Sequence, residues 1–291
     1  MKCDICIREA KPHSISCARC YSIVNATKFH RRPRRLSLIA SYDPPTDQFI
    51  CRLTHIPMAD DDPQSPFYVH SVQRLPGNQL DRMAVCAFVS MLKSDLADWE
   101  LLKVVPHLDD HFRKGTPFKK DIIPFRYWRR KAPAPPKAAI YRGMPIPPSA
   151  KKCFVCIRPA IPNSKYCPRC RKIIFPKPNW KACAEGLKAF YDPDADGFRD
   201  AYLGYLLDTD DLFSPHYTVL DHVNPGEEKV VPCAFWLNDM KGRLRADTFK
   251  RVIAEFANHL RTGEPFDKNV IPIEDWKKNL IRMRLAGKNI A

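Results

Sequence analysis

Eight of the 12 cysteines stand in CxxC pairs, and these pairs form two sets with ten residues between the pairs of each set. A CxxC turn places two thiolates where they can share a tetrahedral ion, and a second turn completes the ligand shell. Four cysteine ligands leave no open coordination position, so the spacing predicts two structural Zn²⁺ sites. An iron–sulfur centre or a metal-free thiol set is the alternative. The two sets are Cys3, Cys6, Cys17 and Cys20, and Cys153, Cys156, Cys167 and Cys170.

The cysteine sets open two copies of one longer sequence. Tyr42-Asp-Pro returns as Tyr191-Asp-Pro, and Gly115-Thr-Pro-Phe returns as Gly263-Glu-Pro-Phe. Between them, Cys86-Ala-Phe aligns with Cys233-Ala-Phe. The two copies therefore provide an internal comparison. Cys51, Cys86, Cys183 and Cys233 fit neither metal set and are expected to be small buried side chains.

A second candidate centre lies in the second copy, where the strand-like run from 217 to 220 is followed by Asp221-His222 and later by Asn238-Asp-Met-Lys241-Gly. From about 217 to 245 this segment resembles the HNH endonuclease family, whose ββα-metal finger carries these motifs. The resemblance implies His222 as general base, Asp221 and Asn238 as ligands of Mg²⁺ or Mn²⁺, and Lys241 on a phosphate. Neutral imidazole suits proton abstraction near pH 7, and a hard ion held by oxygen ligands stabilises a leaving oxygen.

Two departures from that family pattern stand out. Where relatives often carry a middle Asn that orients the base, the nearest position holds Lys229, and Asn224 is close behind His222. The CxxC pair that many relatives place before the helix is replaced by Ala234 and Leu237. The alternative is that Asp221-His222 is an ordinary surface pair on a scaffold that only binds.

The first copy lacks the residues that the chemistry needs. Aligning Ser65 with Ser214 puts Val72 and Gln73 opposite Asp221 and His222, and neither can act as a base or a hard-metal carboxylate. Either Ser90 or Met91 falls opposite Asn238, while Lys93 still matches Lys241. We therefore expect the first copy to be a degenerate docking module.

The chain carries a formal net charge of +16 and has a pI near 9.4. Such an excess predicts a polyanionic partner, with double-stranded DNA as the leading candidate, although solubility alone is the alternative. Clusters of arginine beside aromatic residues suit phosphate contact combined with stacking. The candidate nucleic-acid contacts are Arg31, Arg32, Arg34, Arg35, Arg126, Arg129, Arg130 and Lys241.

These centres require small strands and helices around them. Aromatic and β-branched stretches begin at Phe49 and Tyr68 and recur at Phe198 and Tyr217, and an antiparallel pair is expected in each copy. Apolar residues with a 3.6-residue period predict helices over 101–112 and 249–260, each ending before a glycine. Pro106 is expected to kink the first of these helices.

The predicted class is α+β: two tandem zinc knuckles, each followed by a ββα-metal-like domain, with a Pro-rich linker. The boundaries are 1–131 for the degenerate copy, 132–150 for the linker, and 151–291 for the copy with the candidate active site. Because proline disfavours helix and inner strand, the linker is expected to be an extended spacer.

No apolar run approaches the roughly 20 residues that span a bilayer, and the N-terminus has no hydrophobic signal segment. We expect an intracellular protein, cytoplasmic or nucleoid-associated and not secreted, as a monomer or dimer. The predicted function is a metal-dependent HNH-like endonuclease acting on DNA. The alternatives are a non-catalytic nucleic-acid-binding protein on a pseudo-nuclease scaffold and a zinc-scaffolded protein-interaction hub.

Overall fold

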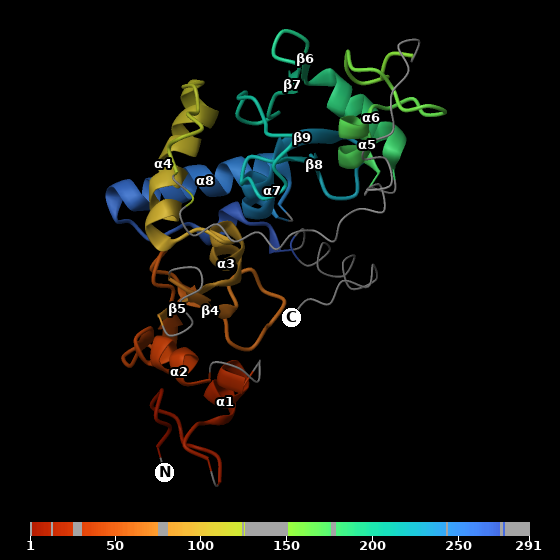
Figure 1. Ribbon diagram of the computed structural model, residues 1–291. Helices are drawn as coiled ribbons and strands as arrows, with labels where there is room; N and C mark the ends of the chain where they lie inside the picture. Colours follow the sequence, from red (N-terminus) through yellow and green to blue (C-terminus); the bar gives the residue numbers. More distant parts are fainter. Residues whose placement is uncertain are drawn as a thin grey trace. The chain divides into compact units, whose positions relative to one another are not determined.

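The computed structural model describes residues 2–12, 14–25, 31–74, 81–123, 125, 151–175, 179–242, 244–273 and 276. This part of the chain is α+β, with helices beside small antiparallel sheets (Figure 1). The Pro-rich segment 132–150 lies outside the described residues. Within the described part, no helix combines the length and the apolar composition that crossing a membrane requires.

The two copies share most of their elements in the same order, although only the first has a third strand in its first sheet and only the second has a 3-10 helix at its end. The first copy has α1 (Ala18–Asn25), α2 (Arg31–Ile39), β1 (Tyr42–Asp43), β2 (Gln48–Ile50), β3 (Pro57–Met58), β4 (Val69–Gln73), β5 (Arg82–Cys86), α3 (Ala87–Lys93) and α4 (Asp98–Lys114). The second has α5 (Pro168–Ile174), α6 (Trp180–Ala189), β6 (Tyr191–Asp192), β7 (Gly197–Phe198), β8 (Thr218–His222), β9 (Val230–Ala234), α7 (Phe235–Lys241), α8 (Ala246–Thr262) and the 3-10 helix η2 (Lys268–Val270).

Each copy contains an antiparallel hairpin followed directly by a helix, β4–β5–α3 in the first and β8–β9–α7 in the second. The register pairs Val72 with Met83 in one hairpin and Asp221 with Val231 in the other. Val72 therefore holds the position of Asp221, as the sequence alignment predicted, and the next residues along, Gln73 and His222, also correspond.

The same register corrects the alignment further along the chain. Cys86 pairs with Val69, and the matching pair in the second hairpin is Ala234 with Thr218. Cys86 therefore corresponds to Ala234 and not to Cys233, so the sequence alignment was wrong by one residue there. Continuing through the helices places Ser90 opposite Asn238.

The strand stretches were found in part, since β7 (Gly197–Phe198) includes only Phe198 of the stretch expected over 198–205, and their pairing was not as expected. In the first copy β2 pairs with β1 and β3, through Phe49 with Tyr42 and with Met58. The stretch after Tyr68 pairs instead with β5. The partner strands are hard to find from the sequence because β9, for example, is buried at all five residues and lacks polar alternation.

The two late helices are confirmed. Helix α4 buries the periodic residues Leu101, Val104 and Leu108, and α8 has a matching buried stripe. Pro106 lies inside α4 without ending it. Helix α8 ends at Thr262 and is capped by Gly263, whose φ of +76° is the left-handed conformation that glycine adopts at low cost.

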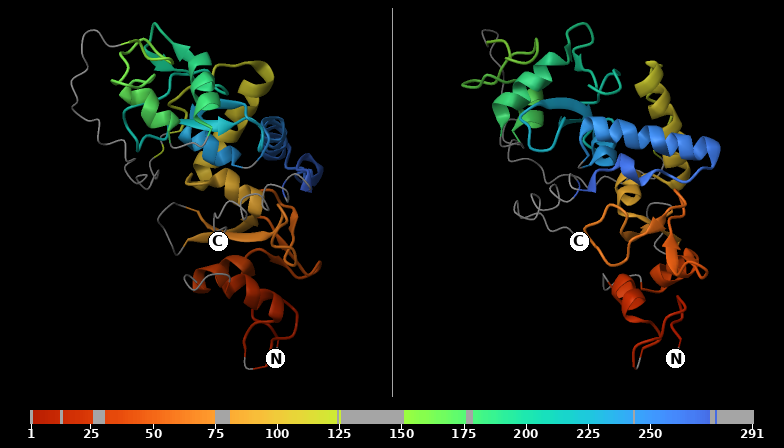
Figure 2. Two further views of the ribbon diagram at one scale, coloured as in Figure 1. Left: turned by 90° about the vertical axis from the view of Figure 1, so that its right-hand side faces the viewer. Right: turned by 180° about the vertical axis from the view of Figure 1, so that it is seen from behind.

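The compact units of the structure do not coincide with the two sequence copies. Unit 1 comprises Met1–Asp109, Phe125–Tyr127 and Gly242–Ala291, whereas unit 2 comprises Asp110–Pro124 and Trp128–Lys241. Unit 1 thus contains α8 of the second copy as well as most of its own α4, whereas unit 2 takes only the segment after Asp109 from the first copy. Figure 2 shows these segments by their sequence colours.

Equivalent aromatic residues join the exchanged segments to their units. In unit 1 the ring of Phe266 lies 5.1 Å from that of Phe88, centroid to centroid. In unit 2 Phe118 stacks on Trp236 at 5.9 Å. The helix alignment equates Phe88 with Trp236, and the sequence repeat equates Phe118 with Phe266. The segments that carry Phe118 and Phe266 are therefore exchanged reciprocally.

Candidate functional site

Each copy brings its four CxxC cysteines into one buried cluster. The four sulfur atoms of a cluster all lie within 4.8 Å of one another. Backbone amides point at the sulfurs: the Ile5 amide lies 3.5 Å from Cys3 Sγ, and the Val155 amide lies 3.4 Å from Cys153 Sγ. An all-thiolate set of this size suits tetrahedral Zn²⁺. The structure thus has two four-cysteine clusters that are compatible with two structural zinc sites.

The remaining four cysteines are buried and belong to neither cluster. This confirms the expectation that Cys51, Cys86, Cys183 and Cys233 are small core side chains. Among the residues that the structure describes, no further group of three or more His, Cys, Asp or Glu side chains could hold a metal.

An aspartate fastens the second knuckle to the β6–β7 turn. The Asp196 carboxylate accepts hydrogen bonds from Arg158 Nε at 2.8 Å, Arg169 Nη2 at 2.7 Å and the Tyr191 hydroxyl at 2.8 Å. Tyr191 in turn accepts a hydrogen bond from the amide of Ile157 at 3.4 Å. These donors lower the pKa of Asp196 to about 2, although partial burial acts in the opposite direction. We call this network the aspartate clamp.

The first copy builds the same clamp around Asp47. Its partners are Arg8, Arg19 and Tyr42, at 2.9, 3.1 and 2.8 Å. Sequence reasoning missed this network, although both copies carry CxRC and an aspartate at the matching turn. The clamp arginines, Arg19 and Arg169 in the second CxxC of each copy, have nearly buried side chains that pair within the protein.

In the hairpin of the second copy, Asp221 lies within a buried polar network. Its Oδ2 accepts a hydrogen bond from the Tyr202 hydroxyl at 2.6 Å and lies 3.1 Å from Lys241 Nζ. Lys241 also contacts Asp221 Oδ1 at 3.3 Å and donates to the backbone oxygen of His222 at 3.1 Å. The side chains of Lys241 and Asp221 are only 1% and 6% exposed. Lys241 therefore faces Asp221 and does not offer its ammonium group to a phosphate.

His222 is exposed at the end of β8, and its orientation is fixed by the following turn. Its Nδ1 lies 2.9 Å from the backbone oxygen of Glu227. A carbonyl oxygen only accepts, so Nδ1 carries the proton and, in the neutral ring, Nε2 is the acceptor. The Glu227 carbonyl thus orients His222, as the middle Asn of the resemblance would. Asn224 contributes by donating to Glu227 Oε2 at 2.9 Å.

The divalent ion implied by the resemblance does not fit the residues as they are arranged. The Asp221 carboxylate is shared by the ammonium of Lys241 and the hydroxyl of Tyr202, and an ion there would have to displace a buried cation. Asn238 is half-buried on α7, and no hydrogen bond among the described residues joins its side chain to Asp221 or His222.

The first copy shows that the buried lysine belongs to the scaffold. Lys93 ends α3, as Lys241 ends α7, and its side chain is 3% exposed. With Val72 in place of the aspartate, Lys93 contacts the backbone oxygen of Leu96 at 2.5 Å and Asp98 at 3.6 Å. Both copies thus bury a lysine at the end of the short helix, whether the facing strand position holds aspartate or valine.

The basic residues predicted to contact nucleic acid have different surroundings. Arg31 and Arg32 are exposed on α2. Arg35 pairs with Asp4, and partial burial lowers the pKa of Arg34. Arg126, Arg129 and Arg130 lie outside the described residues.

Comparison of the chain with protein-family models, curated proteins and solved structures found no match. The resemblance to HNH endonucleases therefore rests on the quoted motifs.

Replacing Lys241 with methionine tests the buried pair. We expect Lys241→Met to lower the free energy of unfolding at pH 7 by about 3–5 kcal/mol, because it leaves a buried carboxylate without its cation. Urea denaturation would measure the loss. The double variant Asp221→Asn/Lys241→Met should recover much of it, since no buried charge remains. A single variant as stable as the unaltered chain would contradict this account.

Proposed function

We propose that the second copy hydrolyses phosphodiester bonds of DNA with His222 as general base, and that the first copy docks the substrate. The observation that carries the proposal is the hydrogen bond between His222 Nδ1 and the Glu227 carbonyl. It leaves an exposed imidazole with its free acceptor nitrogen toward solvent, on a strand–strand–helix unit.

The proposed step is simple. A water molecule attacks phosphorus, its proton passes to Nε2 of His222, and the bond to the leaving oxygen breaks. The leaving oxygen takes a proton from solvent water, and His222 later returns its proton to solvent. The products are a phosphate monoester and a hydroxyl. General-base catalysis of this kind contributes roughly 10²–10⁴-fold to rate. The net charge of +16 supports DNA as the substrate because it attracts the phosphate backbone.

Nicking of supercoiled plasmid tests the proposal. We expect His222→Ala to lower the rate of nicking by at least about 100-fold, because the base is lost. Gln73→Ala at the matching position of the first copy is the control and should nick normally. Reactions with Mg²⁺, with Mn²⁺ and with EDTA would show whether an added ion is used. Equal nicking by His222→Ala would exclude His222 as the base.

One observation favours a second candidate, a nucleic-acid-binding protein without catalysis. The buried Lys241 neutralises Asp221, the only carboxylate in the implied ligand set. On this alternative, the chain binds the plasmid with a steep salt dependence and leaves it intact under every ion condition.

A further inference from the structure

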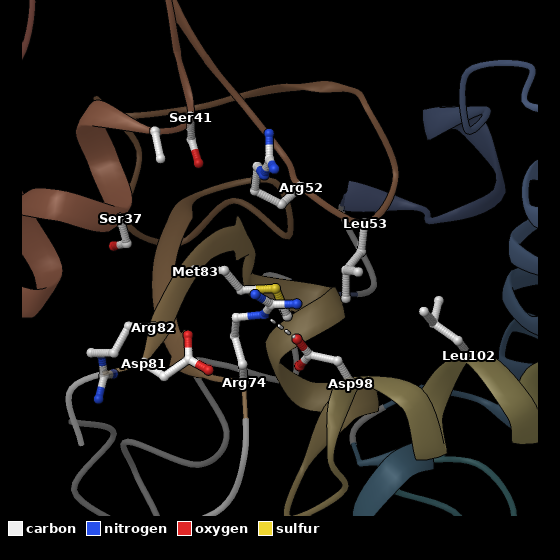
Figure 3. Close-up of a pocket in the computed structure, with 11 residues that line it drawn as sticks. Ser37, Ser41, Arg52, Leu53, Arg74, Asp81, Arg82, Met83, Asp98 and Leu102 are labelled. Atoms are coloured by element: carbon white, nitrogen blue, oxygen red, sulfur yellow. Dashed lines mark hydrogen bonds and ion pairs between the residues drawn. The ribbon is translucent and has the colours of Figure 1, made fainter. Parts of the chain in front are cut away.

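Unit 1 contains a pocket of about 260 Å³ at the turn end of the β4–β5 hairpin. Figure 3 shows its walls, which come from the end of α2, the segment after β2, the ends of both hairpin strands and the start of α4. Three arginines and two aspartates line it, so the charged lining has a net positive charge. In the second copy the same end of the hairpin carries His222.

Arg74 and Arg52 of the pocket differ in whether an ion pair neutralises their charge. Arg74 pairs with Asp98 at 2.9 Å. Arg52 is exposed on the pocket wall, and its guanidinium makes no hydrogen bond or ion pair among the described residues. Arg82 is half-buried, and burial lowers its pKa, with a smaller contribution from the nearby charge of Arg34. Cationic groups thus gather where an anion would relieve their mutual repulsion.

A buried hydroxyl also lines the pocket without a partner. Ser41 is only 4% exposed, and its Oγ makes no hydrogen bond. A buried polar atom without a partner is costly, and a ligand oxygen would satisfy it. A hydroxyl donor near guanidinium groups is a combination that suits a phosphate group.

The second copy lacks these features at every matching position. The shared backbone frame places Ala201 at the position of Arg52, Val223 at that of Arg74, and Val230 at that of Arg82. Ser37 of the pocket corresponds to Gly186, where an added Cβ would lie 2.0 Å from the Val230 backbone oxygen. Helix α6 therefore lies directly against β9 at Gly186.

We propose that the pocket of unit 1 binds one phosphate group of a nucleic-acid strand, through Arg52, Arg82 and the Ser41 hydroxyl. This proposal rests on the proposed action on nucleic acid and assigns the docking role of the first copy to particular residues. The copy that lacks a base at the hairpin end carries cationic groups there instead. Free inorganic phosphate shares this chemistry and is the second source to distinguish.

Fluorescence anisotropy with a labelled DNA duplex tests the proposal in the 291-residue chain. We expect Arg52→Ala to weaken binding about tenfold, the loss of one charge-assisted contact. The slope of log affinity against log salt should fall by about 0.9, as for one phosphate contact on duplex DNA. Arg251→Ala removes the same charge from an exposed position on α8 and is the matched control, expected to retain the affinity and slope.

A second measurement separates failure of the pocket from failure of the proposed function. Calorimetry with inorganic pyrophosphate should show binding to the unaltered chain and loss of binding in Arg52→Ala and Ser41→Ala. Duplex affinity that is unchanged in Arg52→Ala overturns the proposal even if the chain binds DNA. Pyrophosphate binding without DNA binding would refute the proposed function and reduce the pocket to a site for free phosphate. Absence of both would refute both.

Discussion

Replacing Cys170 with serine should remove one zinc ion per chain and unfold the second knuckle. Cys170 is fully buried among its three partner cysteines, and serine cannot supply a thiolate. Binding of structural Zn²⁺ contributes roughly 10–16 kcal/mol to the folding of small zinc domains at pH 7, so this is the largest effect we expect from one residue. Elemental analysis should show zinc per chain falling from two to one, with new protease cleavage in 151–175.

Two matched variants control this experiment. Cys20→Ser should have the same effect on the first knuckle, because Cys20 holds the equivalent position in the other cluster. Cys183→Ser replaces a buried cysteine outside both clusters and should leave two zinc ions bound. A preparation of the unaltered chain that contained iron, or no metal, would contradict the zinc assignment.

Replacing Phe266 with alanine should destabilise unit 1, although this residue belongs to the second copy in the sequence. Phe266 is 3% exposed and packs against Phe88 and Phe256. Truncating a buried phenylalanine costs about 3–5 kcal/mol. Hydrogen exchange should become faster in 82–93, which contains β5 and α3 of the first copy.

Phe118→Ala is the reciprocal variant and should act on the opposite unit. Phe118 packs against Trp236 and Tyr205, so its loss should make hydrogen exchange faster in 230–241. If each copy folded with its own terminal segment, the two variants would give the reverse pattern. A fragment of residues 1–131 should also fail to fold to the stability of unit 1, since it lacks Phe266 and α8.

The sequence predicted what depends on local spacing. The cysteine clusters follow from the CxxC turns, and α8 follows from the periodic Phe249, Val252, Ile253 and Phe256. The position of Val72 opposite Asp221 came from the repeat, and the strand register bears it out.

The rest depends on contacts between residues that are distant in the sequence. Nothing near Phe266 indicates that it packs with Phe88 instead of with its own copy, because both cores offer an aromatic residue at that place. The pairing of Lys241 with Asp221 was missed because Asn-x-x-Lys-Gly does not show which way the lysine points. The hydrogen bond that orients His222 comes from the backbone carbonyl of Glu227, so no side-chain motif in the sequence indicates it.

The two aspartate clamps couple metal binding at each knuckle to the stability of the turn that follows it. Each clamp ties a knuckle, through Arg19 or Arg169, to a turn held by Asp47 or Asp196. When zinc binds only the folded knuckle, each tenfold rise in free zinc above the dissociation constant adds about 1.4 kcal/mol to folding. The clamps carry part of that gain to the β1–β2 and β6–β7 turns. The concentration of free zinc would therefore set the folding stability of each unit, and with it any activity that depends on the folded hairpins.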